Sequence, residues 1–305
     1  MANLSVLIGR IRLQNPITVA SGCHSLDYES LYPLDILGAF VPKTIRTYEW
    51  PGNLPPRITE TPSGVLSAVG IPSKGWDRFV DEDVPKLKKL NTPVILSVVG
   101  RTEEEYAEIV ELSNGLGFLA GMELNLSCPN IRAGGLQFGA NKDTAHSVVA
   151  QCRKKTGLTL IPKLPPDQSN INDVARAVEA AGADAISMIN SPRAMMIDIE
   201  TRKPFLGNKI GALSGPAIRP IAVALLWGVY EAVKIPIIGM GGIATVRDVI
   251  EFLLAGAQAI ALGVVNYFDP MAAPKILAGL EQYLQEKEIA DVNSLVGAAH
   301  SMEKG

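Results

Sequence analysis

The chain has 305 residues, 47% of them hydrophobic and 19% charged, so it can bury a large core and is not expected to be disordered. The net charge of −3, without any long basic run, argues against a nucleic-acid partner. No apolar stretch reaches the roughly 18 residues that a membrane helix needs, and the N-terminus lacks the pattern of a signal peptide. We therefore expect a cytoplasmic protein without a membrane partner.

Cysteine and histidine are sparse. Cys23, Cys128 and Cys152 show no CxxC spacing, and the three histidines are scattered without ligand spacing. The sequence therefore predicts neither a disulfide framework nor a metal site. Three cysteines are also too few for a four-cysteine iron–sulfur cluster within this chain.

Strand-like and helical segments alternate along the second half of the chain. Apolar runs rich in Val and Ile predict strands at 94–100, 121–128, 158–164, 183–190, 235–242 and 257–264. Helices are predicted at 102–117, 143–157, 171–182, 216–233, 245–255 and 270–285. The first of these helices opens with Thr102 and Glu105, which have the spacing of a capping box.

These repeated units favour an α/β fold, a (β/α)8 TIM barrel that forms one domain over residues 1–305. Continuous apolar strands are typical of a parallel sheet covered on both faces. A doubly wound sheet is the alternative, but the early stretch ITVASGCHSL supplies no GxGxxG fingerprint. Two segments exceed a minimal barrel, 45–80 and 191–213, and we expect both at the carboxyl end, where barrel active sites lie.

Polar residues follow the ends of the predicted strands. They are Lys43 and Thr44, Ser97, Asn125, Lys163, and Asn190 with Ser191. In a parallel barrel these groups converge at one end. Lysines are rarely buried unless paired, so Lys43 and Lys163 indicate an anionic or electron-rich ligand such as a reduced flavin. The alternative is that each lysine extends to solvent.

Glycine-rich segments end the last two predicted strands. Gly239, Gly241 and Gly242 follow one strand, and Gly263 follows the next. Each segment precedes a predicted helix, and the last two loops of a barrel often bind phosphate through backbone N–H groups. The alternative is that these glycines only permit tight turns.

Cys128 lies just past a predicted strand, in the stretch NLSCPNIRAGG. A free cysteine is usually a small buried hydrophobic residue. At a strand end, between Asn125 and Asn130 and beside Pro129, it becomes a candidate general base. The neighbouring amides suit a planar ligand that alternates carbonyl and N–H groups.

Nine motifs occur in order along the chain: ITVASG, VPKT, GNLPPRITETPSG, NLSCPN, PKL, MIN, GALSGPAIRPIA, GMGGI and AGAQAIALG. Together they resemble the class 1 dihydroorotate dehydrogenase family over nearly the whole chain. The segment IRAGGLQFG resembles the 1B subgroup. In that subgroup the catalytic subunit pairs with a second subunit that carries FAD and a 2Fe–2S cluster and uses NAD as acceptor. The small number of cysteines here agrees with that division.

The resemblance implies FMN-dependent oxidation of (S)-dihydroorotate to orotate in pyrimidine biosynthesis, in a protein that forms a homodimer. Cys128 would remove the C5 proton while the C6 hydride passes to flavin N5. The expected cofactor-binding residues are Ala20, Ser21, Lys43, Thr44, Ser97, Asn125, Lys163, Ser214, Gly215, Gly241, Gly242, Gly263 and Val264. The expected substrate-binding residues are Lys43, Ser67, Val69, Gly70, Ile71, Asn125, Asn130, Asn190 and Ser191.

The chain departs from the family pattern where the substrate is expected. Ser67 replaces an asparagine, Ser73 and Lys74 replace asparagine-proline, and Pro192 to Ala194 stand where an apolar residue and glycine are common. The N–H groups of 69–71 can still bind a carboxylate, with Lys74 or Arg193 as candidate cations.

Two other functions therefore remain open. One is a related FMN-dependent enzyme that acts on dihydrouracil, dihydrothymine or another cyclic amide. The other is a noncatalytic flavin-binding subunit, against which the presence of Cys128 and the three asparagines argues.

Overall fold

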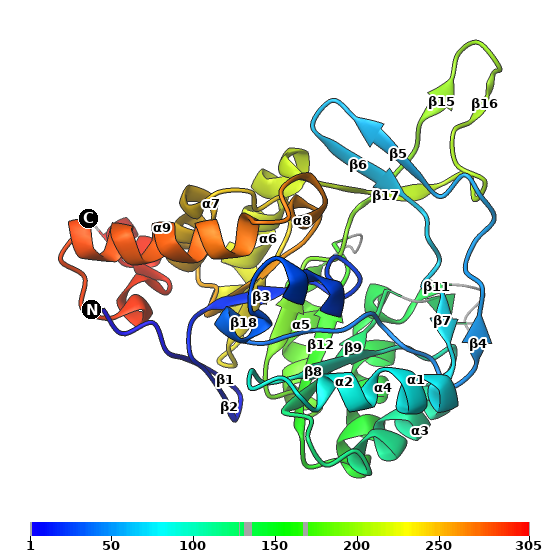
Figure 1. The fold of residues 1–305 in the computed structure, drawn as a ribbon, viewed down its shortest axis with the longest axis horizontal. Coiled ribbons are helices and arrows are strands. Elements are labelled where there is room, and N and C mark those ends of the chain that lie inside the picture. The colour runs from blue at the N-terminus through cyan, green and yellow to red at the C-terminus, as the bar shows by residue number, and fades with distance from the viewer. Residues whose placement is uncertain (1, 128, 131–135, 167–169, 305) are drawn as a thin grey trace.

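Seven parallel strands curl around a buried core in the order β3-β19-β18-β13-β12-β9-β8 (Figure 1). The computed structural model describes residues 2–127, 129–130, 136–166 and 170–304. The seven strands are β3 (Ile17–Val19), β8 (Ile95–Val98), β9 (Gly121–Asn125), β12 (Thr159–Leu164), β13 (Ile186–Met188), β18 (Ile237–Gly239) and β19 (Ala259–Leu262). Almost every residue of these strands is buried, as the continuous apolar runs predict.

The segment 39–45 closes the barrel between β3 and β8, the two ends of the seven-stranded order. Thr18 in β3 forms a parallel bridge with Ala39, and Phe40 forms one with Val94. Ile45 forms a third bridge, with Val98 in β8. Pro42 lies between these bridges, and its missing N–H explains why the eighth strand is irregular. The predicted (β/α)8 fold is confirmed.

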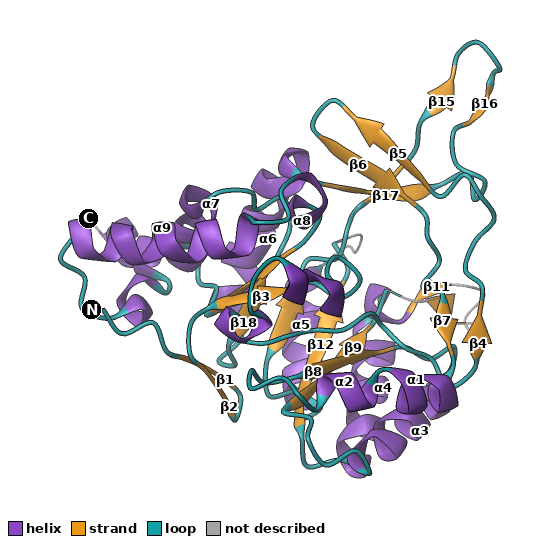
Figure 2. Ribbon diagram, viewed as in Figure 1, coloured by secondary structure: helices purple, strands orange, loops and turns teal. Residues whose placement is uncertain are grey.

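Helices cover the outside of the strands (Figure 2). They are α1 (Trp76–Glu82), α2 (Val84–Leu87), α3 (Glu103–Asn114), α4 (Lys142–Lys155), α5 (Ile171–Ala180), α6 (Arg219–Ala232), α7 (Val246–Leu254), α8 (Val265–Phe268) and α9 (Ala272–Glu286). Short 3-10 helices are η1 (Leu26–Ser30), η2 (Leu34–Ile36), η3 (Phe138–Ala140), η4 (Pro216–Ile218), η5 (Val292–Leu295) and η6 (Ala298–Lys304). The six predicted strands and six predicted helices are confirmed to within a few residues. Thr102 caps α3 by accepting from the Glu105 N–H.

The two long insertions form one antiparallel sheet that projects from the carboxyl end of the barrel (Figure 1). Its order is β14-β17-β6-β5, so two strands from each insertion lie side by side and the two insertions meet between β17 and β6. The strands are β5 (Ile58–Thr61), β6 (Gly64–Ser67), β14 (Arg193–Ala194) and β17 (Gly211–Ser214). Shorter pairs are β4 (Glu49–Trp50) with β7 (Ser73–Lys74), and β15 (Ile197–Asp198) with β16 (Lys203–Pro204). The expected position of both insertions is confirmed.

Two further hairpin-like pairs complete the strands. They are β1 (Val6–Ile8) with β2 (Ile11–Leu13), and β10 (Pro129–Asn130) with β11 (Leu136–Gln137). None of the helices in the described ranges combines the length and apolar composition that crossing a membrane would require.

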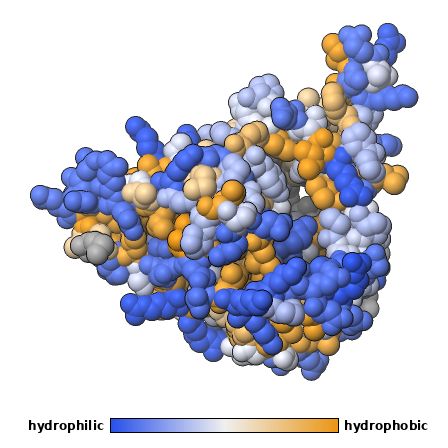
Figure 3. Space-filling view, in the orientation of Figure 1, coloured by the Kyte–Doolittle hydropathy of each residue, from blue (hydrophilic) through white to orange (hydrophobic). Residues whose placement is uncertain are grey.

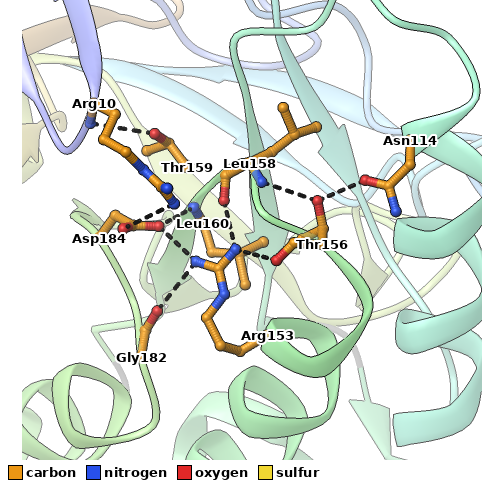
Figure 4. Close-up of polar contacts among 9 residues, drawn as sticks. All are labelled: Arg10, Asn114, Arg153, Thr156, Leu158, Thr159, Leu160, Gly182 and Asp184. Atoms are coloured by element: carbon orange, nitrogen blue, oxygen red, sulfur yellow. Dashed lines mark hydrogen bonds and ion pairs between the residues drawn. The ribbon is translucent and has the colours of Figure 1, made fainter.

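A polar cluster ties together the opposite, amino-terminal end of the barrel (Figure 4). Arg153, near the end of α4, donates to the Asp184 carboxylate at 2.7 Å and to the Leu158 carbonyl at 2.8 Å. The same carboxylate accepts from the Leu160 N–H at 2.9 Å, and Arg10 lies 3.6 Å away. These contacts join the starts of β12 and β13 to helix α4. The amino-terminal end therefore stabilises the barrel, whereas active sites of such barrels lie at the carboxyl end.

Candidate active site

The carboxyl ends of the strands surround a cavity of about 280 Å³. Most of the residues expected to bind cofactor or substrate at strand ends line it. They are Ala20, Ser21, Lys163, Asn190, Ser191, Ser214, Gly215, Gly241, Gly242, Gly263 and Val264. These residues come from six separated parts of the chain, which the fold brings together.

The glycine-rich loops after β18 and β19 form one wall of this cavity. Gly242 has φ of +77°, and an added Cβ would lie 2.7 Å from the backbone nitrogen of Arg219. Gly263 differs, because an added Cβ would meet no atom within 4 Å. One glycine is therefore required by the packing of the loop, while the other leaves its backbone open to the cavity.

A buried ion pair lies below the cavity. The Lys163 Nζ is 3.7 Å from a carboxylate oxygen of Glu123, and both side chains are about 95% buried, with 6% and 5% exposure. Ser97 and Ser187 donate to the two carboxylate oxygens at 3.0 and 2.9 Å. A buried charge requires such partners, because desolvation of an unpaired ion is costly.

A chain of hydroxyl groups extends this network upward to the cavity wall. The Ser97 and Thr44 hydroxyl oxygens are 2.9 Å apart, and those of Thr44 and Ser21 are 3.0 Å apart. Ser97 thus lies beneath the cavity and does not line it. It connects Glu123 to the cavity-lining Ser21.

Lys43 opens on a second cavity of about 500 Å³, whose walls also include Thr44, Trp50 and Ser73. Desolvation by the surrounding protein lowers the pKa of Lys43 to about 8. Cys23 opposes this shift, and the positive charges of Lys163 and Arg46 add to it. The side chain remains accessible to solvent although protein walls surround it. An anionic ligand beside Lys43 would therefore raise the pKa of this lysine and favour its charged form.

The described asparagines at the strand ends contact one another. The Asn190 side-chain amide donates to Asn125 Oδ1 at 3.3 Å and to the Ser127 hydroxyl at 2.8 Å. The side-chain oxygen Oδ1 of Asn190 accepts from the Ser191 backbone N–H at 2.8 Å. The Tyr106 hydroxyl donates to the Asn125 backbone carbonyl from below. Both amide groups are therefore held in fixed orientations. Cys128 lies outside the described residues, and Asn130 is described only as part of strand β10.

The residues that depart from the family pattern have structural partners. Ser67 ends β6 and pairs with Ala212 in β17. The Ser73 hydroxyl accepts from the N–H groups of Arg46 and Gly75 at 3.1 and 3.2 Å. Lys74 forms ion pairs with Glu82 and Asp83 at 2.5 and 3.0 Å, so it is already neutralised.

Comparison with known proteins gives the family. The family model for dihydroorotate dehydrogenase matches residues 3–284. The chain belongs to the dihydroorotate dehydrogenase family. It is 48% identical to the "dihydroorotate dehydrogenase B (NAD(+)), catalytic subunit" of Desulforudis audaxviator over 97% of both chains. It is 45% identical to proteins of the same name from Desulforamulus reducens, over 98% of this chain and 99% of the relative, and Trichlorobacter lovleyi, over 97% and 98%. The family consists of flavin-dependent oxidoreductases that act on a CH–CH bond.

Sequence reasoning missed three residues at this site. Glu123 is an acidic residue inside the apolar run GMELN, which is the signal that could have identified it. Arg46 is only 5% exposed, and its position two residues beyond a strand-end threonine gave no indication of burial. Cys23 lines the first cavity, where burial raises the pKa of its thiol.

The ion pair gives a first prediction. Glu123→Gln keeps the size of the side chain but leaves the buried Lys163 charge uncompensated. We expect the free energy of unfolding to fall by about 3 kcal/mol, the lower end of the range for breaking a buried pair. Urea unfolding followed by circular dichroism would measure it.

The matched control is Glu111→Gln, which breaks the exposed pair with Lys155 at 2.9 Å. A surface pair of this kind contributes about 0–1 kcal/mol, so little change is expected. Equal destabilisation by the two substitutions would contradict the role given to Glu123.

Proposed function

We propose that this protein is the catalytic subunit of a dihydroorotate dehydrogenase, a single domain over residues 1–305 that oxidises (S)-dihydroorotate to orotate with bound FMN. The observation that carries the proposal is the meeting of eleven expected site residues around one cavity at the carboxyl end of the barrel. Membership of the dihydroorotate dehydrogenase family supports the same reaction. The barrel alone would not, because many chemistries share it.

The cavity has the donor set that FMN requires. The open backbone at Gly263 and the left-handed Gly241 and Gly242 provide N–H groups near the starts of α8 and α7, which suits a phosphate. Lys163 offers a cation for the ring, and Ser214 with Gly215 supplies further polar groups on the facing wall. The residues present therefore fit this cofactor, and we propose that they hold it, together with Ala20, Ser21, Lys43, Thr44, Ser97, Asn125 and Val264.

The remaining chemistry belongs to the side chains of this protein. Bound FMN supplies the hydride acceptor. Cys128 acts as the base that removes the proton from C5 of the substrate. Asn125, Asn130 and Asn190, with Ser191, hold the ring amides, and Lys43 holds the negative charge of the substrate. The contact of the Asn190 amide with Asn125 fixes both groups before the substrate arrives, which lowers the cost of ordering them.

The onward path of the electrons needs a second protein. We propose a partner subunit that carries FAD and a 2Fe–2S cluster, with NAD as the final acceptor. The relatives are named NAD(+)-linked catalytic subunits, which supports this assignment. This chain has three cysteines, one fewer than such a cluster needs. The cytoplasm is the proposed location.

We also propose that the chain forms a homodimer. Large apolar side chains are exposed on the two insertions that form the projecting sheet and its hairpin (Figure 3). They are Leu54, Ile58, Met195, Ile197, Ile199, Phe205 and Ile210. Exposed apolar groups that gather in this way typically mark a protein interface, and a C2 dimer is the commonest closed assembly.

The reaction itself is tested by flavin bleaching. Anaerobic addition of (S)-dihydroorotate to the purified FMN-loaded protein should bleach the flavin absorbance, while dihydrouracil and dihydrothymine should bleach it much more slowly. Cys128→Ala should lower the rate by about 100-fold or more, the usual contribution of a positioned base. No bleaching by dihydroorotate would reject the proposal, and faster bleaching by a neutral ring would favour the cyclic-amide alternative.

The lowered pKa of Lys43 predicts the pH dependence of anion binding. Lys43 is protonated below its pKa of about 8 and loses its charge as the pH rises through that value. The affinity for orotate should therefore be constant near pH 6–7 and fall above pH 8. Titrations followed by the flavin spectrum, compared with Lys43→Met, would isolate this step. Identical pH profiles for the two proteins would contradict it.

The dimer proposal predicts the effect of a charge on the projecting hairpin. Ile199 is 82% exposed, so Ile199→Asp should leave the fold intact but disrupt an apolar interface. Light scattering should give twice the 32.5 kDa chain mass for the unmodified protein and a lower mass for the variant. Leu7→Asp, at a 56% exposed residue of β1, is the control. A monomeric unmodified protein would reject the dimer.

A further inference from the structure

Four consecutive backbone carbonyls accept hydrogen bonds from one short segment. Asn53 donates from its side-chain amide to the Ala68 carbonyl at 2.9 Å, and from its backbone N–H to the Val69 carbonyl at 3.1 Å. The indole of Trp50 donates to the Gly70 carbonyl at 3.0 Å, and Arg46 Nε donates to the Ile71 carbonyl at 3.4 Å. Segment 46–53 therefore binds the whole carbonyl edge of residues 68–71.

This arrangement fixes the direction of the N–H groups that follow. The peptide bonds between residues 68 and 71 are trans, and in a planar trans peptide the carbonyl and the next N–H point in opposite directions. The N–H groups of Val69, Gly70 and Ile71 therefore all point away from segment 46–53. Within the described part of the chain, no protein group accepts from them.

The backbone of this loop is unfavourable without such support. Gly70 has φ of +81° and Ile71 has φ of +50°, and a left-handed conformation is costly for a β-branched residue. The two segments also lie too close for side chains. A Cβ on Gly52 would lie 2.5 Å from the Val69 carbonyl, and one on Gly70 would lie 2.6 Å from the Asn53 nitrogen. The loop keeps this shape because segment 46–53 holds it.

Arg46 also places a positive charge beside the loop of residues 68–71. Its side chain is 5% exposed, donates to the Tyr48 hydroxyl at 3.0 Å, and lies over the rings of Tyr48 and Trp50 at 5.7 and 5.9 Å. It is close enough to Lys43 to affect the titration of that lysine. The same side chain thus orients the loop and makes the surrounding potential positive.

We infer that Arg46 and Trp50 are positioning residues that hold the N–H groups of Val69 to Ile71 as a carboxylate-binding nest, and that they set the preference for a ring bearing a carboxylate. The inference rests on the proposed function. It removes the need for a compensating cation at Lys74, because that lysine is neutralised by Glu82 and Asp83. Aligned backbone N–H groups bind anions without a dedicated amide side chain, so Ser67 does not have to replace the asparagine expected there.

The test compares two ligands that differ by the carboxylate. Orotate carries it, and uracil has the same ring without it. Each is titrated into the FMN-loaded protein and followed by the flavin spectrum, which measures binding without turnover. Arg46→Met should weaken the binding of orotate by about 10- to 100-fold, which is the effect of losing a charged hydrogen-bond donor. The binding of uracil should weaken much less.

Trp50→Phe keeps an aromatic ring but removes the indole N–H. This substitution should weaken the binding of orotate by about 3- to 10-fold, which is the effect of losing one neutral hydrogen bond. The matched control is Trp76→Phe on the neighbouring helix α1, where the indole lies 5.9 Å from the Phe79 ring and donates no hydrogen bond to residues 68–71 in the described part of the chain. Trp76→Phe should leave the affinity for both ligands unchanged.

Loss of structure alone would weaken the binding of both ligands by the same factor. An unchanged ratio of orotate affinity to uracil affinity in Arg46→Met would therefore overturn the inference. If that variant does not retain FMN, equal orotate affinity in Trp50→Phe and the unmodified protein overturns it instead. An unmodified protein that prefers orotate but is not bleached by dihydroorotate would reject the proposed function and leave this inference standing.

Discussion

The buried pair of Lys163 and Glu123 is the interaction on which the site depends. A lysine inside a barrel is stable only with an opposite charge close by, and Glu123 provides it at 3.7 Å with two serine hydroxyls on its oxygens. The partners come from four neighbouring strands, β13, β12, β9 and β8, so the pair forms only when these strands have assembled side by side. The position of the cation at the cavity therefore depends on the assembly of this half of the sheet.

Segment 46–53 holds the neighbouring loop of residues 68–71 in place. It has almost no regular structure of its own, with only Glu49 and Trp50 in a strand. Its donors nevertheless satisfy four successive carbonyls of the neighbouring insertion. Buried or half-buried backbone groups must be paired, and here the pairing of the carbonyl edge leaves the N–H groups of the other edge without a protein acceptor among the described residues. Rigidity at this end comes from side chains such as Arg46 and Trp50.

The sequence predicted the strands and helices well because each is a local pattern. Apolar runs and the Thr102 cap are visible within a window of about ten residues. It also indicated Lys43, Lys163 and the glycine-rich loops, since charged or flexible residues at apolar strand ends are unusual. Glu123 was missed because one acidic residue in a buried strand gives no periodic signal. Arg46 was missed because the carbonyl of Ile71, to which it donates, lies 25 residues away, across strands of two residues that no propensity identifies.

The two lysines at this end of the barrel differ in the charges around them. Lys163 has a carboxylate partner, so it contributes an oriented donor with little net charge, which suits a ring that is neutral when oxidised. Lys43 makes no ion pair within the described residues, and the charges of Lys163 and Arg46 add to desolvation in lowering its pKa. An anion placed beside Lys43 therefore gains more than one placed beside Lys163, because it relieves repulsion between cations as well as supplying attraction. Under the proposed function, this difference in counter-charge places the carboxylate of the substrate on the Lys43 side and the cofactor on the Lys163 side.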